Sequence, residues 1–169
     1  MRILFISRAF PPITGGIENQ NAALAEWLPR FTETTVIANH HGRKALPWFA
    51  PYALIQALFL MRRFDVLLLG DGTLAIIGFI IKKWYPKKHV VSVVHGLDLN
   101  YNSHSLGVWY ETALVTIYRS LWLKRFLPVL DGYLAVSTAT KQQAVESVGL
   151  SSHKCFVIPN GVVTERFSE

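Results

Sequence analysis

The sequence predicts an α/β protein built on one open parallel sheet with helices on both faces, and three observations carry this prediction. Short runs rich in Val, Ile and Leu recur along the chain, and they have few polar residues that could face solvent. Segments with helical spacing of apolar residues separate these runs, as in successive βα units. The chain has 169 residues, of which 51% are hydrophobic, so it can form one domain with its own core.

The elements follow from these patterns in order. Strands are expected at residues 2–7, 34–38, 64–69, 88–94, 132–136 and 154–158. Helices are expected from Ile17 onward, over residues 45–61, 73–83 and 105–130, and after Ser137.

The expected helix at residues 45–61 has two interpretations. Gln56 is its one strongly polar side chain, and Pro47 and Pro51 interrupt its first part, so it is not expected to span a membrane. It can lie at a membrane interface, with its aromatic residues among lipid headgroups. It can equally pack against the sheet with its flanking arginines in water.

The first loop joins the strand at residues 2–7 to the first helix. Gly15 and Gly16 stand at the start of that helix, where free backbone N–H groups favour an anion. A tight turn without a ligand is the alternative. A dinucleotide fingerprint fits poorly because the Gly-x-Gly-x-x-Gly pattern is absent.

Several polar residues are expected at one edge of the sheet. His95 and Asp98 follow the strand at residues 88–94, and Ser137 follows a later strand. Because parallel strands end at the same edge, such residues can meet over one ligand. Ser137 can instead cap the helix that follows it.

The charge pattern indicates possible partners. The chain carries 17 Lys and Arg against 11 Asp and Glu, a net charge of +6. Basic pairs flank apolar stretches, at Arg43 and Lys44, Arg62 and Arg63, Lys82 and Lys83, Lys87 and Lys88, and Lys124 and Arg125. This arrangement favours an anionic membrane surface over nucleic acid, although basic groups at helix ends can simply be solvated.

Metal, disulfide and secretion signals are all weak. His40 and His41 lack further ligands at metal-binding spacing, so neither a metal nor a cofactor is expected. Cys155 is the single cysteine and is expected to be a packed side chain in a reducing compartment. The N-terminus lacks a secretory pattern, so we expect a cytoplasmic protein, peripheral on the inner face of the membrane.

Four motifs in this order resemble the N-terminal half of family 4 glycosyltransferases, and the resemblance covers the whole chain. They are Pro11-Pro12 with Gly15-Gly16-Ile17-Glu18, His95-Gly96-Leu97-Asp98, Val136-Ser137, and Val157-Ile158-Pro159-Asn160-Gly161-Val162. The resemblance implies a GT-B fold of two Rossmann-like domains. Residues 1–169 would then be the acceptor-binding domain, and the donor-binding domain with its paired glutamates would be absent from this chain.

The resemblance also implies roles for individual residues. Gly15 and Gly16 would approach the donor diphosphate and sugar, and His95 would be catalytic, donating a hydrogen bond near the transferred sugar. Acceptor-binding roles fall on Glu18, Asp98 and Ser137, although Glu18 can instead favour the helix N-terminus and Asp98 can begin a turn. A hinge to the missing domain falls on Asn160 and Gly161. The family retains anomeric configuration and needs no metal in the site.

The expected function is therefore transfer of a sugar from a nucleotide-sugar to a glycan or lipid-linked acceptor at the membrane surface. The fragment alone is expected to be inactive. Two alternatives stay open: a stand-alone nucleotide-binding Rossmann-like module, and a GT-B epimerase acting on nucleotide-sugars.

Overall fold

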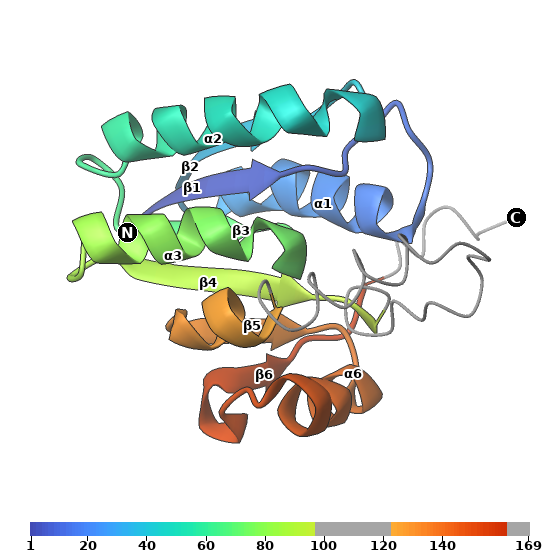
Figure 1. Ribbon diagram of the computed structural model, residues 1–169. Coiled ribbons are helices and arrows are strands. Elements are labelled where there is room, and N and C mark those ends of the chain that lie inside the picture. The colour runs from blue at the N-terminus through green and yellow to red at the C-terminus, as the bar shows by residue number, and fades with distance from the viewer. Residues whose placement is uncertain (97–122, 162–169) are drawn as a thin grey trace, which may run out of the picture.

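The computed structural model describes residues 1–96 and 123–161 (Figure 1). Within these residues six strands form one sheet, in the order β2-β1-β3-β4-β5-β6, and every neighbouring pair is parallel. The strands are β1 (Arg2–Ser7), β2 (Glu33–Ala38), β3 (Val66–Leu69), β4 (His89–Val94), β5 (Gly132–Ala135) and β6 (Cys155–Val157). The predicted open parallel sheet is confirmed.

Helices connect the strands. They are α1 (Gly16–Trp27), α2 (Leu46–Leu60), α3 (Ala75–Trp84) and α6 (Thr138–Gln143), the last continuing into a π-helical turn, η7 (Ala144–Val148). Short 3-10 turns are η1 (Leu28–Arg30), η2 (Arg43–Ala45), η3 (Gly72–Leu74), η6 (Leu127–Val129) and η8 (Ser152–Lys154). Most of the helix expected at residues 105–130 lies outside the described residues.

The two faces of the sheet are covered by different helices. Along β1, Leu4 and Ile6 belong to the larger core cluster, together with buried residues of α2 and α3. The alternate residues Ile3 and Phe5 belong to a second cluster, against which residues of α1 pack. Figure 1 shows α1 behind the sheet and α2 and α3 in front of it. The expectation of helices on both faces is therefore confirmed.

The topology has one switch point, between β1 and β3. From β1 the chain passes outward to β2, and α2 then carries it back to β3 on the other side of β1. In open parallel sheets a ligand binds beyond the carboxyl ends of the strands at such a reversal, because the loops diverge there and leave a crevice.

Helix α2 packs against the sheet, as one interpretation of residues 45–61 predicted, and its contact with a membrane interface stays a prediction. Phe49, Ala53 and Ala57 are buried in the core, whereas side chains on the opposite side are exposed. The predicted interruption does not occur: α2 runs through Pro51, which lies near the helix start and lacks only the N–H that would bond to the carbonyl of Pro47. None of the described helices is long and apolar enough to cross a membrane.

Candidate active site

The candidate site lies at the carboxyl edge of the sheet, on the right of Figure 1. Because all six strands are parallel, the residues that follow them share this edge. Arg8 follows β1, Asp71 lies one residue beyond Gly70, which follows β3, and His95 follows β4. Arg8 and Asp71 therefore flank the switch point, and His95 is one strand away.

A buried carboxylate joins the two sides of the switch point. Asp71 is fully buried, and the Nε of Arg8 lies 3.0 Å from its Oδ1 and 2.9 Å from its Oδ2. The backbone N–H of Thr73 donates to Oδ1 at 2.8 Å, and the Thr73 hydroxyl contacts both partners. Asp71 thus caps η3 while it holds Arg8 across the gap between β1 and β3.

The imidazole of His95 is held against the same turn. Its side chain is buried, and its Nε2 lies 3.1 Å from the carbonyl oxygen of Gly70. Since a carbonyl oxygen accepts but cannot donate, Nε2 carries the proton. Burial lowers the pKa of His95 below 6.5, while the Gly70 hydrogen bond and the nearby Asp71 and Glu18 carboxylates oppose that shift and Arg8 adds to it.

This arrangement bears on the role expected for His95. At neutral pH the ring is uncharged and its proton is directed to Gly70, so Nδ1 carries the free lone pair. Donation from Nδ1 would require the imidazolium, which burial disfavours. The geometry therefore favours a histidine that accepts a hydrogen bond at Nδ1 over the donor expected from the sequence.

The lowered pKa of His95 predicts a pH dependence of stability. The unfolded imidazole binds a proton near pH 6.5, whereas the folded one does so only at lower pH. Between these values the unfolded state holds more protons, so the free energy of unfolding should fall as pH decreases below 6.5, by at most about 1.4 kcal/mol per pH unit. Urea unfolding across this window measures the slope.

A comparison of variants isolates the contribution of His95. In His95→Gln the part of the slope due to His95 should disappear, because glutamine does not titrate. In His153→Gln, which removes an exposed histidine, the slope should stay close to that of the wild type. Equal slopes in the wild type and His95→Gln would contradict the buried, neutral state of this ring.

The glycine loop lies at the start of α1, as predicted. The carboxylate of Glu18 occupies the space that a Cβ at position 15 would need, so only glycine fits there without moving Glu18. A Cβ at Gly16 would meet nothing within 4 Å. Glu18 therefore lies against the positive end of α1 and within electrostatic reach of His95, which brings the first loop and His95 to one site.

Two buried asparagines brace the segment that follows β1. The Asn21 amide of α1 donates to Ser7 Oγ at 2.9 Å and to the Ala9 carbonyl at 3.2 Å. The Asn39 amide, beyond β2, donates to the carbonyl of Arg8 at 3.1 Å. A Cβ at Gly70 would come within 2.9 Å of the Asn21 amide, so the turn after β3 packs tightly on α1. These contacts fix the backbone from which Arg8 extends.

Ser137 also stands at the carboxyl edge of the sheet, shortly after β5, and its partner Thr140 lies 3.8 Å from where a Cβ at Gly96, next to His95, would stand. Ser137 caps α6: its Oγ accepts from Thr140 N at 3.1 Å and lies 2.9 Å from the Thr140 hydroxyl. Ser137 therefore caps the helix, as one of the two alternatives predicted. Its role in binding the acceptor substrate stays a prediction. Asn160 and Gly161 are exposed beyond β6, and Asp98 lies outside the described residues.

Sequence reasoning gave no role to Arg8, Asp71, Thr73 or Asn21. A signal was available for two of them, because Arg8 directly follows a buried strand and Asp71 stands in a Gly-Asp-Gly turn after another. Ionic residues in those positions fall at the ligand-binding edge of a parallel sheet.

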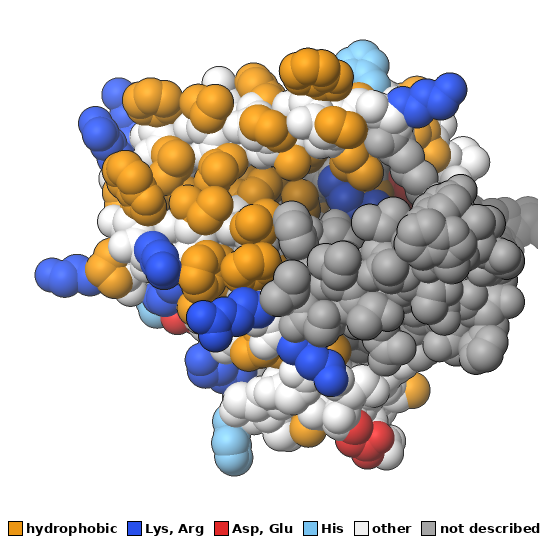
Figure 2. Space-filling model, in the orientation of Figure 1, with side chains coloured by type: hydrophobic (Ala, Val, Ile, Leu, Met, Phe, Trp, Pro, Cys, Tyr) orange, Lys and Arg blue, Asp and Glu red, His pale blue; other side chains and the backbone are white. Residues whose placement is uncertain are grey.

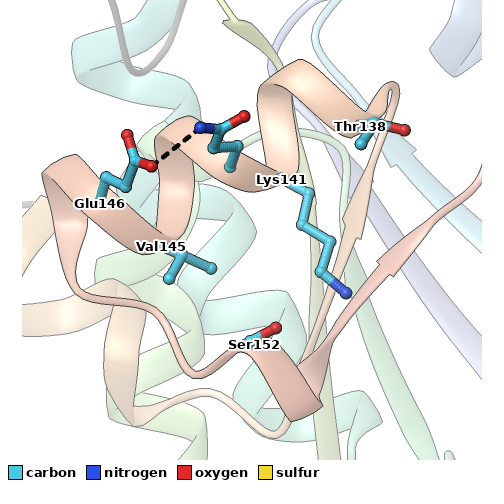
Figure 3. A pocket seen from close by; sticks show the side chains of 6 residues that line it. Thr138, Lys141, Val145, Glu146 and Ser152 are labelled. Carbon is cyan, nitrogen blue, oxygen red and sulfur yellow. Dashed lines mark hydrogen bonds between the residues drawn. The ribbon is translucent and has the colours of Figure 1, made fainter.

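A shallow pocket of about 270 Å³ lies elsewhere, between α6, η7 and η8 (Figure 3). Lys141 and Val145 extend toward Ser152 across it, and Gln142 is hydrogen bonded to Glu146 at 2.9 Å. None of the predicted site residues lines this pocket. Among the described residues there is also no group of three or more His, Cys, Asp or Glu side chains that could hold a metal ion.

These features define a Rossmann-like α/β domain whose polar residues converge at the switch point of the sheet. The family described as Glycosyltransferase Family 4 matches residues 14–166, and the chain belongs to that family. The resemblance found in the sequence is confirmed.

Relatives of known identity agree with this assignment. A phosphatidylinositol N-acetylglucosaminyltransferase subunit from Arabidopsis thaliana is 24% identical over 99% of this chain, which spans 41% of that protein. Two solved structures show the fold at 16% identity and 96% coverage of this chain. Anabaena Alr3699/HepE in complex with UDP gives a TM-score of 0.52 over 44% of its length, and the lipopolysaccharide outer core galactosyltransferase WaaB gives 0.56 over 46%.

Proposed function

We propose that this chain is the acceptor-binding domain of a retaining glycosyltransferase of the hexosyltransferase type. The enzyme moves a sugar from a nucleotide-sugar to a glycan or lipid-linked acceptor at a membrane surface. Because the chain spans less than half of its relatives, the donor-binding domain is proposed to lie in a longer polypeptide, joined through Asn160 and Gly161. The family membership and the UDP bound to HepE support a nucleotide-sugar donor.

The observation that carries this proposal is the buried, neutral His95 at the carboxyl edge, beside the loop that contains Gly16. In the proposed complex the donor sugar lies over this edge, and the Nδ1 of His95 accepts a hydrogen bond from a sugar hydroxyl. The open space at Gly16 lets the donor phosphates approach the main chain. Arg8 and Asp71 hold the two sides of the crevice at a fixed separation.

The proposed acceptor substrate and the proposed cellular location of the enzyme have separate support. The name of the Arabidopsis relative includes the lipid phosphatidylinositol. This supports a lipid-linked acceptor for the present enzyme. Basic residues around α2 and α3 support attachment to an anionic membrane surface, and we place the enzyme on the cytoplasmic side. Glu18, whose carboxylate acts electrostatically on His95, is proposed to bind the acceptor together with Asp98 and Ser137.

The test is the stereochemistry of the product. The complete polypeptide is supplied with a nucleotide-sugar and a lipid-linked acceptor, and NMR compares the anomeric configuration of donor and product. Retention is expected. Inversion would overturn the proposed mechanism, and isomerisation of the nucleotide-sugar without acceptor would identify an epimerase. Tight nucleotide-sugar binding by the 169-residue chain alone, measured by calorimetry, would instead favour a stand-alone binding module.

A further inference from the structure

The outward face of α2 is apolar although it is exposed. Its side chains recur at helical spacing and form one stripe along the helix, which we call the α2 stripe. The stripe consists of Trp48, Tyr52, Ile55 and Phe59, whose exposed fractions are 83%, 55%, 53% and 68%. A helix that is apolar on all sides is normally buried, so the α2 stripe lacks a covering layer among the described residues.

Cationic side chains border this apolar surface. Figure 2 shows hydrophobic side chains gathered over α2 and α3, with Lys and Arg around them. Lys44 precedes α2, Arg62 and Arg63 follow it, and Lys83 lies near the end of α3, with its Nζ 4.9 Å from the Phe79 ring centroid. All four of these cations are exposed, so their charges can meet an anionic partner.

Acidic side chains offset few of these charges, although Lys82 forms an ion pair with Asp131 at 2.9 Å. Residues 44–88 contain seven Lys and Arg (Lys44, Arg62, Arg63, Lys82, Lys83, Lys87 and Lys88) and two acids, Asp65 and Asp71. Asp71 is buried beside Arg8, and Asp65 accepts from the backbone N–H of Arg2 at 2.8 Å. An exposed apolar stripe within a cationic border fits an anionic bilayer, where the apolar side chains enter the interface and the cations meet lipid phosphates.

We propose that the α2 stripe, together with Trp84, is the surface by which this chain adsorbs to an anionic lipid bilayer. Trp84 is 70% exposed at the end of α3. Tyr85 donates from its hydroxyl to the Leu58 carbonyl at 2.7 Å and thereby ties that end of α3 to α2. The end of α3 that carries Trp84 is therefore fixed beside α2.

The proposal also orients the site, and this step rests on the proposed function. Helix α2 begins after the carboxyl end of β2 and ends before β3, so Trp48 lies at the site edge and Arg62 at the opposite edge. With α2 flat on the bilayer, the crevice opens along the membrane surface at the level of the headgroups. A lipid-linked acceptor can then reach His95 while its tail stays in the bilayer.

The experiment is vesicle cosedimentation with the 169-residue chain. Phosphatidylcholine vesicles containing phosphatidylglycerol should bind it, and pure phosphatidylcholine should bind it more weakly. The substitution Phe59→Glu should weaken binding about tenfold or more, as should the double substitution Arg62→Glu and Arg63→Glu. Phe31→Glu is the matched control, because Phe31 is 81% exposed but follows η1, outside the α2 stripe, and it should bind like the wild type.

Lys82 is left unchanged in these variants because its Nζ forms an ion pair with Asp131 at 2.9 Å and bonds to the Lys88 carbonyl. Circular dichroism verifies that each variant is folded. Equal binding by Phe59→Glu and the wild type would overturn the proposal. Concentration-dependent dimers that Phe59→Glu dissociates, without vesicle binding by the wild type, would identify a second copy as the occupant and overturn it as well.

Vesicle binding and the proposed sugar transfer can be tested independently of each other. In the complete enzyme Phe59→Glu should retain transfer to a short-chain, water-soluble acceptor analogue while vesicle binding is lost. The variant His95→Ala should lose sugar transfer but bind vesicles like the wild type. Vesicle binding without any sugar transfer would therefore reject the proposed function alone, and transfer without vesicle binding would reject this inference alone.

Discussion

Replacing Asp71 with alanine is expected to lower the free energy of unfolding by about 3 kcal/mol, because it removes the carboxylate from a buried ion pair. Asp71 is fully buried, whereas the Arg8 side chain is 19% exposed, which places the loss at the lower end of the range for such pairs. The variant also loses the acceptor of the Thr73 N–H. Denaturant unfolding measures the change.

Two comparisons make this prediction specific. Asp71→Asn keeps an acceptor for the Thr73 N–H but removes the charge, so it should lose less stability than alanine. Glu26→Ala removes an exposed ion pair with Arg30, whose atoms are 3.3 Å apart, and should change stability by no more than about 0.5 kcal/mol. A loss in Asp71→Ala no larger than that in Glu26→Ala would refute the role assigned to the buried pair.

Replacing His95 with alanine in the complete enzyme is expected to lower kcat about 100- to 1,000-fold while donor affinity changes little. The proposed hydrogen bond at Nδ1 matters most when charge redistributes at the anomeric centre, so its loss affects the transition state more than the bound donor. Steady-state kinetics and calorimetric titration of the donor measure the two quantities separately.

Glutamine and asparagine variants distinguish the roles of the two ring nitrogens of His95. Glutamine places an N–H near the position of Nε2 and can keep the bond to Gly70, so His95→Gln should stay folded but lose turnover. Asparagine places an acceptor near Nδ1, so His95→Asn should recover part of the rate. His89→Ala is the control, since this exposed histidine begins the same strand at its opposite end. Wild-type rates in His95→Ala would exclude it from catalysis.

Much of the fold could be predicted from the sequence because buried strands leave a strong local pattern. The strand expected at residues 2–7 is β1, with the same bounds. The third strand is expected from residue 64 but begins at Val66, because Phe64 and Asp65 connect it to the turn at residues 61–63, and the Asp65 carboxylate accepts from the backbone N–H of Arg2. The apolar run is therefore longer than its strand, because it includes the buried Phe64 of the preceding connection.

The ionic part of the site could not be predicted, because it depends on strand order. Arg8 and Asp71 are adjacent only because β3 lies beside β1 while β2 takes the other side, and local patterns do not specify that order. A Gly-Asp-Gly segment by itself indicates a turn. In contrast, His95 is identified because its motif belongs to a set that resembles a family, and its hydrogen bond to Gly70 becomes visible only in three dimensions.

The pairing of Arg8 with Asp71 has a consequence for biosynthesis. The two residues are 63 positions apart, so a ribosome that has translated β1, β2 and α2 has not yet supplied the acid that Arg8 requires. The loop between them must close before the pair can form, at an entropic cost that local contacts do not incur. The nascent chain therefore completes this side of the sheet only after the apolar surface of α2 has already emerged from the exit tunnel.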